Sequence, residues 1–328
     1  MKLACDGSVA LIVNPQAGKD VRRLVAPAPI VTDIDKIGIL RRILAALDAL
    51  AVSRVWVMPD LGGLAERALA GRRWRFEVRW LAIPGLASAD DTQAATRDAV
   101  RQGVRVIVAL GGDGTQRLVA KEAAGVPMLA ISTGTNNAFP VMIDATLAGM
   151  AAGWVAKGQV EVARVTRFHP RLEVAIDGQA ADSALVDVAA TRDLVTGSRA
   201  IYDWRMWREA VILTPQIPVV GLGSLALALV GAMADPPPAV HVRFGDGGRQ
   251  VLAPIAPGMV AAVPIAETSP VFWGETVALQ PAAGCLAFDG EREQVVSPRQ
   301  RVTVHEVAEG ARVLDVRRCF QAASAPPG

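Results

Sequence analysis

A glycine-rich segment with a single carboxylate follows the apolar run at residues 104–110. It reads Gly111-Gly112-Asp113-Gly114-Thr115, and a helical pattern begins within a few residues of it. Glycines let the backbone bend sharply and approach a ligand closely, and the first amides of a helix favour an anion. We therefore interpret residues 111–115 as a phosphate-binding loop with Asp113 inside it. The alternative is an ordinary turn in which Asp113 caps the helix.

A second polar loop follows the apolar run at residues 128–131. It reads Ser132-Thr133-Gly134-Thr135-Asn136-Asn137 and offers small donors and free amides to the phosphates or the base of a nucleotide. The chain contains three asparagines, and each lies in a loop where a predicted strand ends: Asn14, Asn136 and Asn137. This placement favours a binding role, although asparagine is also a common turn residue.

The first loop of the chain could supply a positive charge to a phosphate. Asn14-Pro15-Gln16-Ala17-Gly18-Lys19 follows the apolar run at residues 9–13, and Lys19 is the candidate partner. The loop lacks the spacing of a Walker A motif, and it lacks the full Gly-x-Gly-x-x-Gly fingerprint of dinucleotide-binding domains. A standard P-loop ATPase or dehydrogenase is therefore disfavoured.

Two acids flank a tight turn near the C-terminus. They are Asp289 and Glu291, in the segment Phe288-Asp289-Gly290-Glu291-Arg292. A β-hairpin turn favours Asp-Gly for its backbone conformation alone. A structural role and a chemical role for this turn are therefore both open.

These loops lie between strand-like and helix-like segments, which alternate through the first half of the sequence. Such a repeat predicts a doubly wound parallel sheet with helices on both faces, in which ligands bind beyond the carboxyl ends of the strands. The three loops lie at such ends. The expected strands are residues 9–13, 55–58, 76–83, 104–110 and 128–131, and the expected helices are residues 37–51, 61–70, 92–101, 116–123 and 141–152.

After about residue 155 the pattern changes to short alternating runs separated by Gly, Pro and Asp, which is typical of an all-β sandwich. We predict an α/β nucleotide-binding domain over residues 1–153 and a β-sandwich domain over residues 154–328. The longest apolar run, residues 219–234, is expected to be a buried helix or an interdomain connection because it is too short to span a bilayer comfortably. The expected strands are residues 171–176, 184–188, 240–244, 259–263, 276–279, 302–307 and 312–316.

The composition disfavours several classes of protein. A chain of 328 residues with 52% hydrophobic and 20% charged residues is expected to be compact, with two domains. Its 34 basic and 32 acidic residues leave a net charge of only +2, without the strong positive potential that attracts nucleic acid, so no such partner is expected. The three cysteines and three histidines are scattered, which disfavours a disulfide framework or a zinc site, and the scattered tryptophans are interpreted as packing residues. No secretory signal is recognisable, so we expect a cytoplasmic protein without a membrane partner.

The motifs, taken in order, resemble those of the superfamily that contains NAD kinases, diacylglycerol kinases and sphingosine kinases. Residues 111–115 look like the signature of that superfamily. Further motifs, spread over nearly the full chain, are most similar to its ATP-NAD kinase-like branch named after acetoin catabolism protein X. They are Asn14-Pro15-x-Ala17-Gly18-Lys19-Asp20-x-Arg22-Arg23-Leu24, Gly134-Thr135-Asn136-Asn137-Ala138-Phe139-Pro140, Pro254-Ile255-Ala256-Pro257-Gly258 and Asp289-Gly290-Glu291-Arg292-Glu293.

The resemblance implies an ATP-dependent kinase that uses Mg²⁺, with a cleft between an α/β domain and a β-sandwich domain. It implies that Asp113 is catalytic, either as a base or as an organiser of Mg-ATP and thus a metal ligand, and that Asp289 or Glu291 also serves the reaction. It further implies that a segment near residues 308–320 returns to the first domain, and that the protein assembles as a dimer or tetramer. The expected nucleotide contacts are Asn14, Gly18, Lys19, Gly111, Gly112, Gly114, Thr115, Thr133, Gly134, Thr135, Asn136 and Asn137.

One departure from the resemblance concerns the acceptor. NAD kinases hold it with an Asn-Glu dipeptide, and this chain has no asparagine after position 137. The expected acceptor is a hydroxyl of NAD, or of another hydroxylated metabolite or cofactor. The alternative from another class is a regulatory protein that binds a nucleotide or dinucleotide without catalysis. A lipid kinase is disfavoured because no extended apolar surface is evident beyond residues 219–234.

Overall fold

The structure is a computed structural model, in which the described residues are 7–18, 27, 30–85, 88–134, 137–194, 203–231, 233, 235–280 and 282–324. Lys19, Thr135 and Asn136, which the sequence predicts to contact a nucleotide, lie outside the described residues. Residues 20–24 of the first motif lie outside them as well.

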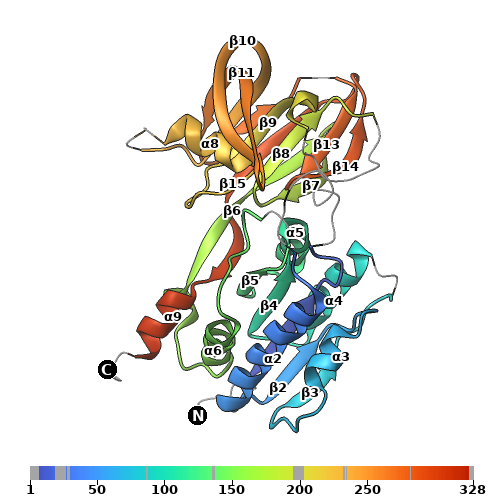
Figure 1. Ribbon diagram of the computed structural model, residues 1–328, viewed down its shortest axis with the longest axis vertical. Coiled ribbons are helices and arrows are strands. Elements are labelled where there is room, and N and C mark those ends of the chain that lie inside the picture. The colour runs from blue at the N-terminus through green and yellow to red at the C-terminus, as the bar shows by residue number, and fades with distance from the viewer. Residues whose placement is uncertain are drawn as a thin grey trace.

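The first half of the chain forms a parallel sheet with helices packed against it (Figure 1). Its strands run in the order β3-β2-β1-β4-β5, and all of these pairings are parallel. The strands are β1 (Ser8–Val13), β2 (Arg54–Val57), β3 (Glu77–Trp80), β4 (Val106–Gly111) and β5 (Met128–Ser132). The helices are α2 (Asp33–Ala49), α3 (Leu64–Leu69), α4 (Ala89–Arg101), α5 (Asp113–Glu122) and α6 (Ala145–Ala156). Each strand and helix predicted for this half is present; α2, α4 and α5 begin three or four residues earlier than expected, and α3 and α6 three or four residues later.

The second half contains two sheets that pack face to face. Strands β15, β6, β7 and β12 extend the first sheet beyond β5, and six further strands form a second sheet in the order β11-β10-β9-β8-β13-β14. One buried apolar cluster takes side chains from both sheets, among them Leu172, Val304 and Phe288. The predicted fold class, an α/β domain followed by a β-sandwich, is therefore confirmed. The strands are β6 (Thr166–Ile176), β7 (Gln179–Ala184), β8 (Asp187–Thr191), β9 (Trp207–Leu213), β10 (Ala239–Ala256), β11 (Met259–Val271), β12 (Thr276–Ala278), β13 (Gly284–Phe288), β14 (Glu291–Val296) and β15 (Val302–Leu314).

Strand β15 touches both halves of the molecule. It pairs with β6 in antiparallel fashion along its length, and near its end Val313 pairs in parallel with Met128 of β5. Helix α9 (Val316–Ala323) follows, and the Phe320 ring packs edge-on against Trp154 of α6 with the ring centres 4.7 Å apart. Figure 1 shows α9 beside the α/β half.

The helices of the second half are short. Helix α7 (Val162–Val165) precedes β6, a 3-10 helix spans Trp204–Met206, and α8 (Leu222–Val230) lies within the apolar run at residues 219–234. Leu222, Leu225 and Ala226 of α8 are buried against β9 and β10. The prediction of a buried helix in this run therefore agrees with the structure. Within the described residues, the helices are too short or too polar to cross a membrane.

Candidate active site

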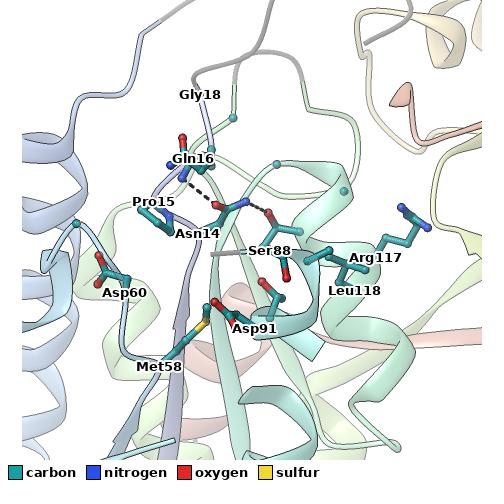
Figure 2. A pocket seen from close by; sticks show the side chains of 18 of the residues that line it. Asn14, Pro15, Gln16, Gly18, Met58, Asp60, Ser88, Asp91, Arg117 and Leu118 are labelled. Carbon is teal, nitrogen blue, oxygen red and sulfur yellow. Dashed lines mark hydrogen bonds between the residues drawn. The ribbon is translucent and has the colours of Figure 1, made fainter. Parts of the chain in front are cut away.

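A cleft of about 1040 Å³ opens where the parallel strands end. Its walls come from the loops after β1, β2, β3, β4 and β5 and from the turn between β13 and β14. Figure 2 shows Asn14, Asp60, Asp91 and Arg117 around this pocket. Ligand pockets commonly measure about 300–1,000 Å³, so the cleft has room for a nucleotide. Of the described site residues predicted from the sequence, those that line it are Asn14, Gly18, Gly112, Asp113, Gly114, Thr115, Gly134, Asn137, Asp289 and Glu291.

The glycines after β4 and β5 are required by close contacts. A Cβ atom added to Gly134 would lie 2.4 Å from Oδ1 of Asn137, and one added to Gly112 would lie 2.9 Å from the same atom. A Cβ on Gly111 would lie 2.4 Å from the Cβ of Thr115. These positions therefore bring the two loops together closely enough to form one cradle, which is the geometry that a phosphate-binding loop needs.

Asp113 ties the two loops to each other. It is the first residue of α5, and its carboxylate accepts hydrogen bonds from the backbone amides of Ala138 at 2.9 Å and Phe139 at 2.8 Å. The N-cap position of α5 is Gly112, where no side chain caps the helix. The alternative in which Asp113 caps its own helix is therefore wrong, because the carboxylate holds the neighbouring loop and leaves the first turn of α5 uncapped by a side chain.

Asn14 connects the first loop to α5. Its Nδ2 donates to Oγ1 of Thr115 at 2.8 Å, and its Oδ1 accepts from the amide of Gln16 at 2.8 Å (Figure 2). The amide of Asn14 in turn donates to the carbonyl of Leu110 at the end of β4. A single asparagine side chain therefore fixes the curvature of its own loop and the position of that loop relative to the glycine-rich loop.

Gly111 and Thr133 lie behind the cleft rather than in its wall. Gly111 is the last residue of β4, and its carbonyl accepts from the amide of Thr133 at 3.1 Å. The Thr133 side chain is fully buried. Both residues therefore stabilise the backbone behind the cradle. They do not line the cleft, so the direct nucleotide contact that the resemblance implies for them is not seen.

The structure adds a buried lysine that the sequence reasoning missed. Lys36 of α2 has no exposed surface, and its Nζ donates to the carbonyl of Pro15 at 2.9 Å and lies 3.6 Å from Oδ1 of Asp33. The ammonium group thus holds the loop after β1 from beneath. Its position in the sequence carried a signal, since Lys36 lies four residues before Leu40 and so falls on the apolar face of the predicted helix.

The turn between β13 and β14 places its first acid deep in the protein. Asp289 and Gly290 have φ angles of +51° and +79°, as a type I′ hairpin turn requires. The Asp289 carboxylate is buried and accepts from the amides of Leu185 at 2.9 Å and Val186 at 2.8 Å. It therefore holds the backbone before β8 in place.

Arg117 of α5 connects this turn to the first half. Its Nη1 donates to Oδ2 of Asp182 at 2.5 Å, and its Nε lies 3.8 Å from Oδ2 of Asp289. Burial raises the pKa of Asp289 well above its ordinary value, with Asp187 and Asp113 acting in the same direction and Arg117 opposing them. Because Arg117 is itself only 2% exposed, this is an ion pair inside the protein, between elements from the two halves.

Glu291, the second acid of the turn, faces the cleft above α5. A Cβ added to Gly114 would lie 3.4 Å from the carboxyl carbon of Glu291. The two acids therefore occupy different environments: Asp289 is committed to backbone amides, while Glu291 borders the cleft at the first turn of the helix.

Of the acids that border the cleft, Asp113 and Glu291 are suited to a metal ion that arrives with a phosphate ligand. Asp60 accepts from the amides of Leu64 and Ala65, and Asp91 accepts from the amide of Gly85, so both serve the local backbone. The described residues contain no group of three or more His, Cys, Asp or Glu side chains that could hold a metal by themselves. Mg²⁺ in nucleotide sites is usually bound by one or two carboxylates together with phosphates and water, and Asp113 and Glu291 fit that smaller requirement.

Comparison with known proteins assigns each half of the chain. Residues 9–159 match the family model of the ATP-NAD kinase N-terminal domain, and residues 170–309 match that of the acetoin catabolism protein X C-terminal domain. The chain is 35% identical over 327 residues to acetoin catabolism protein X from Cupriavidus necator, covering 95% of this chain and 91% of that protein. Among solved structures, it is similar to one assigned as a diacylglycerol kinase from Bacillus anthracis, with 13% identity, a TM-score of 0.42 and coverage of 94% of this chain and 97% of that chain.

Proposed function

The chain belongs to the acetoin catabolism protein X family, and on this premise we propose that it is an ATP-dependent kinase of small molecules. MgATP binds in the cleft where the parallel strands end, and its terminal phosphoryl group passes to a hydroxyl of the acceptor. The match of residues 9–159 to an ATP-NAD kinase domain supports this class of reaction. NAD is the first acceptor to test, and the name of the relative from Cupriavidus necator adds metabolites of acetoin breakdown.

The observation that carries the proposal is the position of Asp113. Its carboxylate joins the glycine-rich loop to the amides of Ala138 and Phe139, at the wall of the cleft. Phosphoryl transfer depends mostly on positioning and on stabilising charge, with little covalent chemistry for the protein to perform. A carboxylate beside an amide-rich cradle meets this need, because it can orient the acceptor hydroxyl and take its proton as the new bond forms.

The remaining residues of the cleft bind the phosphates or hold the loops in position. The amides at the start of α5 and around Gly134 face the phosphates, and Asn14 keeps the first loop against Thr115. Mg²⁺ bound with the triphosphate would supply charge neutralisation at its oxygens, and Glu291 would hold it while Asp113 serves the acceptor hydroxyl. Arg117 fixes α5 against the turn that carries Glu291.

The proposal is tested by turnover of the purified protein with Mg-ATP. ADP release is measured with NAD, with NADP formation as the specific readout, and with a panel of hydroxylated metabolites and cofactors. The variant Asp113→Asn keeps the size of the side chain, and we expect it to lose turnover by at least about a hundredfold, the scale of a positioned acid or base, while retaining the fold.

Asp144→Asn is the matched control. Asp144 also accepts a backbone amide, that of Thr146 at 2.8 Å, but it caps α6 and does not line the cleft. Unchanged turnover in Asp113→Asn would remove Asp113 from the mechanism. Nucleotide binding without turnover across the whole panel would favour the non-catalytic regulatory protein instead.

A further inference from the structure

Two irregular segments of the chain hold two acids of the site. Residues 138–139 donate two backbone amides to the carboxylate of Asp113, and residues 185–186 donate two to the carboxylate of Asp289. Neither segment belongs to a helix or a strand. The positions of the two carboxylates therefore depend on the side chains that keep these segments in place.

The imidazole of His169 contacts both segments. His169 lies in β6, which runs from the α/β half into the sandwich (Figure 1). Its Nε2 lies 2.7 Å from the carbonyl oxygen of Leu185, and its ring packs edge-on against that of Phe139 with the ring centres 4.6 Å apart. The amide of Leu185 donates to Asp289, and the amide of Phe139 donates to Asp113. One side chain therefore connects the two acids through a single residue on each side.

The hydrogen bond to Leu185 defines the protonation of the His169 ring. A carbonyl oxygen can only accept a hydrogen bond, so Nε2 must carry a proton. Burial lowers the pKa of His169 to about 4, so near neutral pH the ring is uncharged and its one N–H is on Nε2. An uncharged ring adds little to the field around the two carboxylates, and its influence on them comes from its contacts.

The backbone of His169 is a rigid support for this ring. His169 pairs with Ala311 of β15, and a Cβ added to the neighbouring Gly310 would lie 2.6 Å from the carbonyl oxygen of His169. The two strands therefore approach closely at this point. Functional groups are positioned most precisely when their supporting side chains come from strands or helices, and β6 meets this condition for the two irregular segments.

We propose that His169 is a positioning residue of the phosphoryl transfer. It keeps the segment that donates to Asp113 at a fixed distance from the segment that holds Asp289, and so directs the Asp113 carboxylate at the acceptor hydroxyl. This inference rests on the proposed kinase function, in which Asp113 takes the proton of that hydroxyl. The phosphates of ATP are assigned to other amides, at Gly134 and at the start of α5, so loss of the His169 contacts should affect turnover more than ATP binding.

Two substitutions break the connection at its opposite ends. His169→Phe keeps an aromatic ring and removes the N–H that Leu185 accepts, whereas Phe139→Leu removes the partner ring and keeps that N–H. We expect each variant to lower kcat about tenfold, the effect of one hydrogen bond or one aromatic pair, and to keep the KM for Mg-ATP within about twofold of the wild-type value. A raised KM with an unchanged kcat in either variant would overturn the inference.

The double variant distinguishes positioning from simple packing. The two contacts act in series, so His169→Phe combined with Phe139→Leu should lower kcat little more than either substitution alone. Independent packing contacts would instead give losses of kcat that multiply, and that result would overturn the inference.

His305→Phe is the matched control. His305 also makes a hydrogen bond with its side chain, from Nδ1 to Oγ1 of Thr276 at 3.0 Å, and it does not line the cleft. We expect its kcat to equal that of the wild-type protein, and a loss as large as that of His169→Phe would overturn the inference. Thermal unfolding of every variant checks that the fold is kept.

Amide hydrogen exchange tests the connection without turnover. In His169→Phe, exchange at residues 138–139 should be about tenfold faster than in the wild-type protein, the effect of weakening one hydrogen bond, while exchange in β4 stays the same. Exchange that is unchanged, or that is faster in both segments alike, would overturn the positioning of Asp113 by His169.

The two kinds of measurement separate this inference from the kinase proposal. If an acceptor is phosphorylated and both single variants turn over as fast as the wild-type protein, the kinase proposal stands and the role of His169 is wrong. If no acceptor is phosphorylated, the kinase proposal fails, and hydrogen exchange still decides whether His169 positions Asp113.

Discussion

The carboxylate of Glu291 lies directly over Gly114, close enough that a Cβ on the glycine would lie 3.4 Å from its carboxyl carbon. The two residues come from opposite halves of the chain, the first from the start of β14 and the second from the first turn of α5. The turn of the β-sandwich therefore closes over the helix N-terminus at the point where the phosphate cradle begins. Because the space around each glycine of the cradle differs in this way, alanine substitutions at these positions are expected to differ in their effect on stability and on ATP binding.

Gly134→Ala is expected to damage the cradle, whereas Gly114→Ala is expected to be tolerated. The new methyl group at position 134 would overlap Oδ1 of Asn137 at 2.4 Å, but at position 114 it would only touch Glu291. We expect Gly134→Ala to lower the free energy of unfolding by about 1–3 kcal/mol and to weaken ATP binding. Gly114→Ala should change stability by less than about 1 kcal/mol, because alanine also favours the helix. Urea unfolding and calorimetric titration with Mg-ATP give both values, and equal losses in the two variants would contradict this account of the cradle.

Asn14 and Thr115 should act as a pair. Their side chains are hydrogen-bonded at 2.8 Å across 101 positions of sequence. In a double-mutant cycle of Asn14→Ala and Thr115→Val, we expect a coupling free energy of about 1 kcal/mol in urea unfolding, the typical net value of such a bond. Each single variant should weaken ATP binding, and the double variant should bind little worse than either. Strictly additive effects would mean that the bond does not hold the two loops together.

Removing the charge of Arg117 should be costly, while removing that of Lys121 should not. Both side chains contact Asp182, but Arg117 is buried and also faces the buried Asp289, whereas Lys121 is 41% exposed. Breaking a buried pair from one side commonly costs about 3–5 kcal/mol, so we expect a loss of that order for Arg117→Met in chemical denaturation. Lys121→Met should cost less than about 1 kcal/mol, as for exposed ion pairs. Adding Asp289→Asn to Arg117→Met should recover part of the loss, and a further loss of stability would argue against the pairing of Arg117 with Asp289.

His169 should make the protein less stable as the pH falls. Burial lowers the pKa of this imidazole to about 4, and its Nε2 is hydrogen-bonded to the carbonyl of Leu185 at 2.7 Å. In the unfolded chain the group titrates near about 6.5, so between pH 6.5 and 4 the unfolded state binds more protons than the folded state. Stability is therefore full above pH 6.5 and is lost as the pH falls through this range. Urea unfolding at several pH values should show a smaller slope for His169→Gln than for the wild-type protein, and an identical slope would refute the assignment.

Residue patterns predicted most of the fold because the first half is regular. Strands such as β4 are continuous apolar runs, and the helices between them repeat their apolar residues at helical spacing. Strands β9 and β13 were missed because the strands of the second half were expected to alternate apolar and polar residues, and these two do not. Residues such as Ala287 and Phe288 of β13 pack into different apolar clusters on the two faces of the sheet, so the strand is buried throughout and shows no alternation. The motifs also identified the family, and the 35% identity to the relative from Cupriavidus necator confirms it.

The site was predictable where it depends on loops at strand ends, and not where it depends on distant contacts. Sequence reasoning named Asp113, Asn14 and Glu291, which line the cleft. It could not show that Asp289 is committed to the amides of residues 185–187, because those contacts span about a hundred positions of sequence. It also treated the tryptophans as packing residues, whereas the structure buries the Trp207 indole N–H without a hydrogen-bond partner in the described part of the chain.

The sharing of β15 between the two sheet regions makes the halves of this protein interdependent. Residues 302–314 satisfy the backbone of β6 and β12, reach β5 at Val313, and lead into the helix that rests on α6. A fragment that ends before residue 302 would leave these neighbours with an open edge and an uncovered helix face. Neither half is thus a free-standing module, and we expect the whole chain to melt in one cooperative transition.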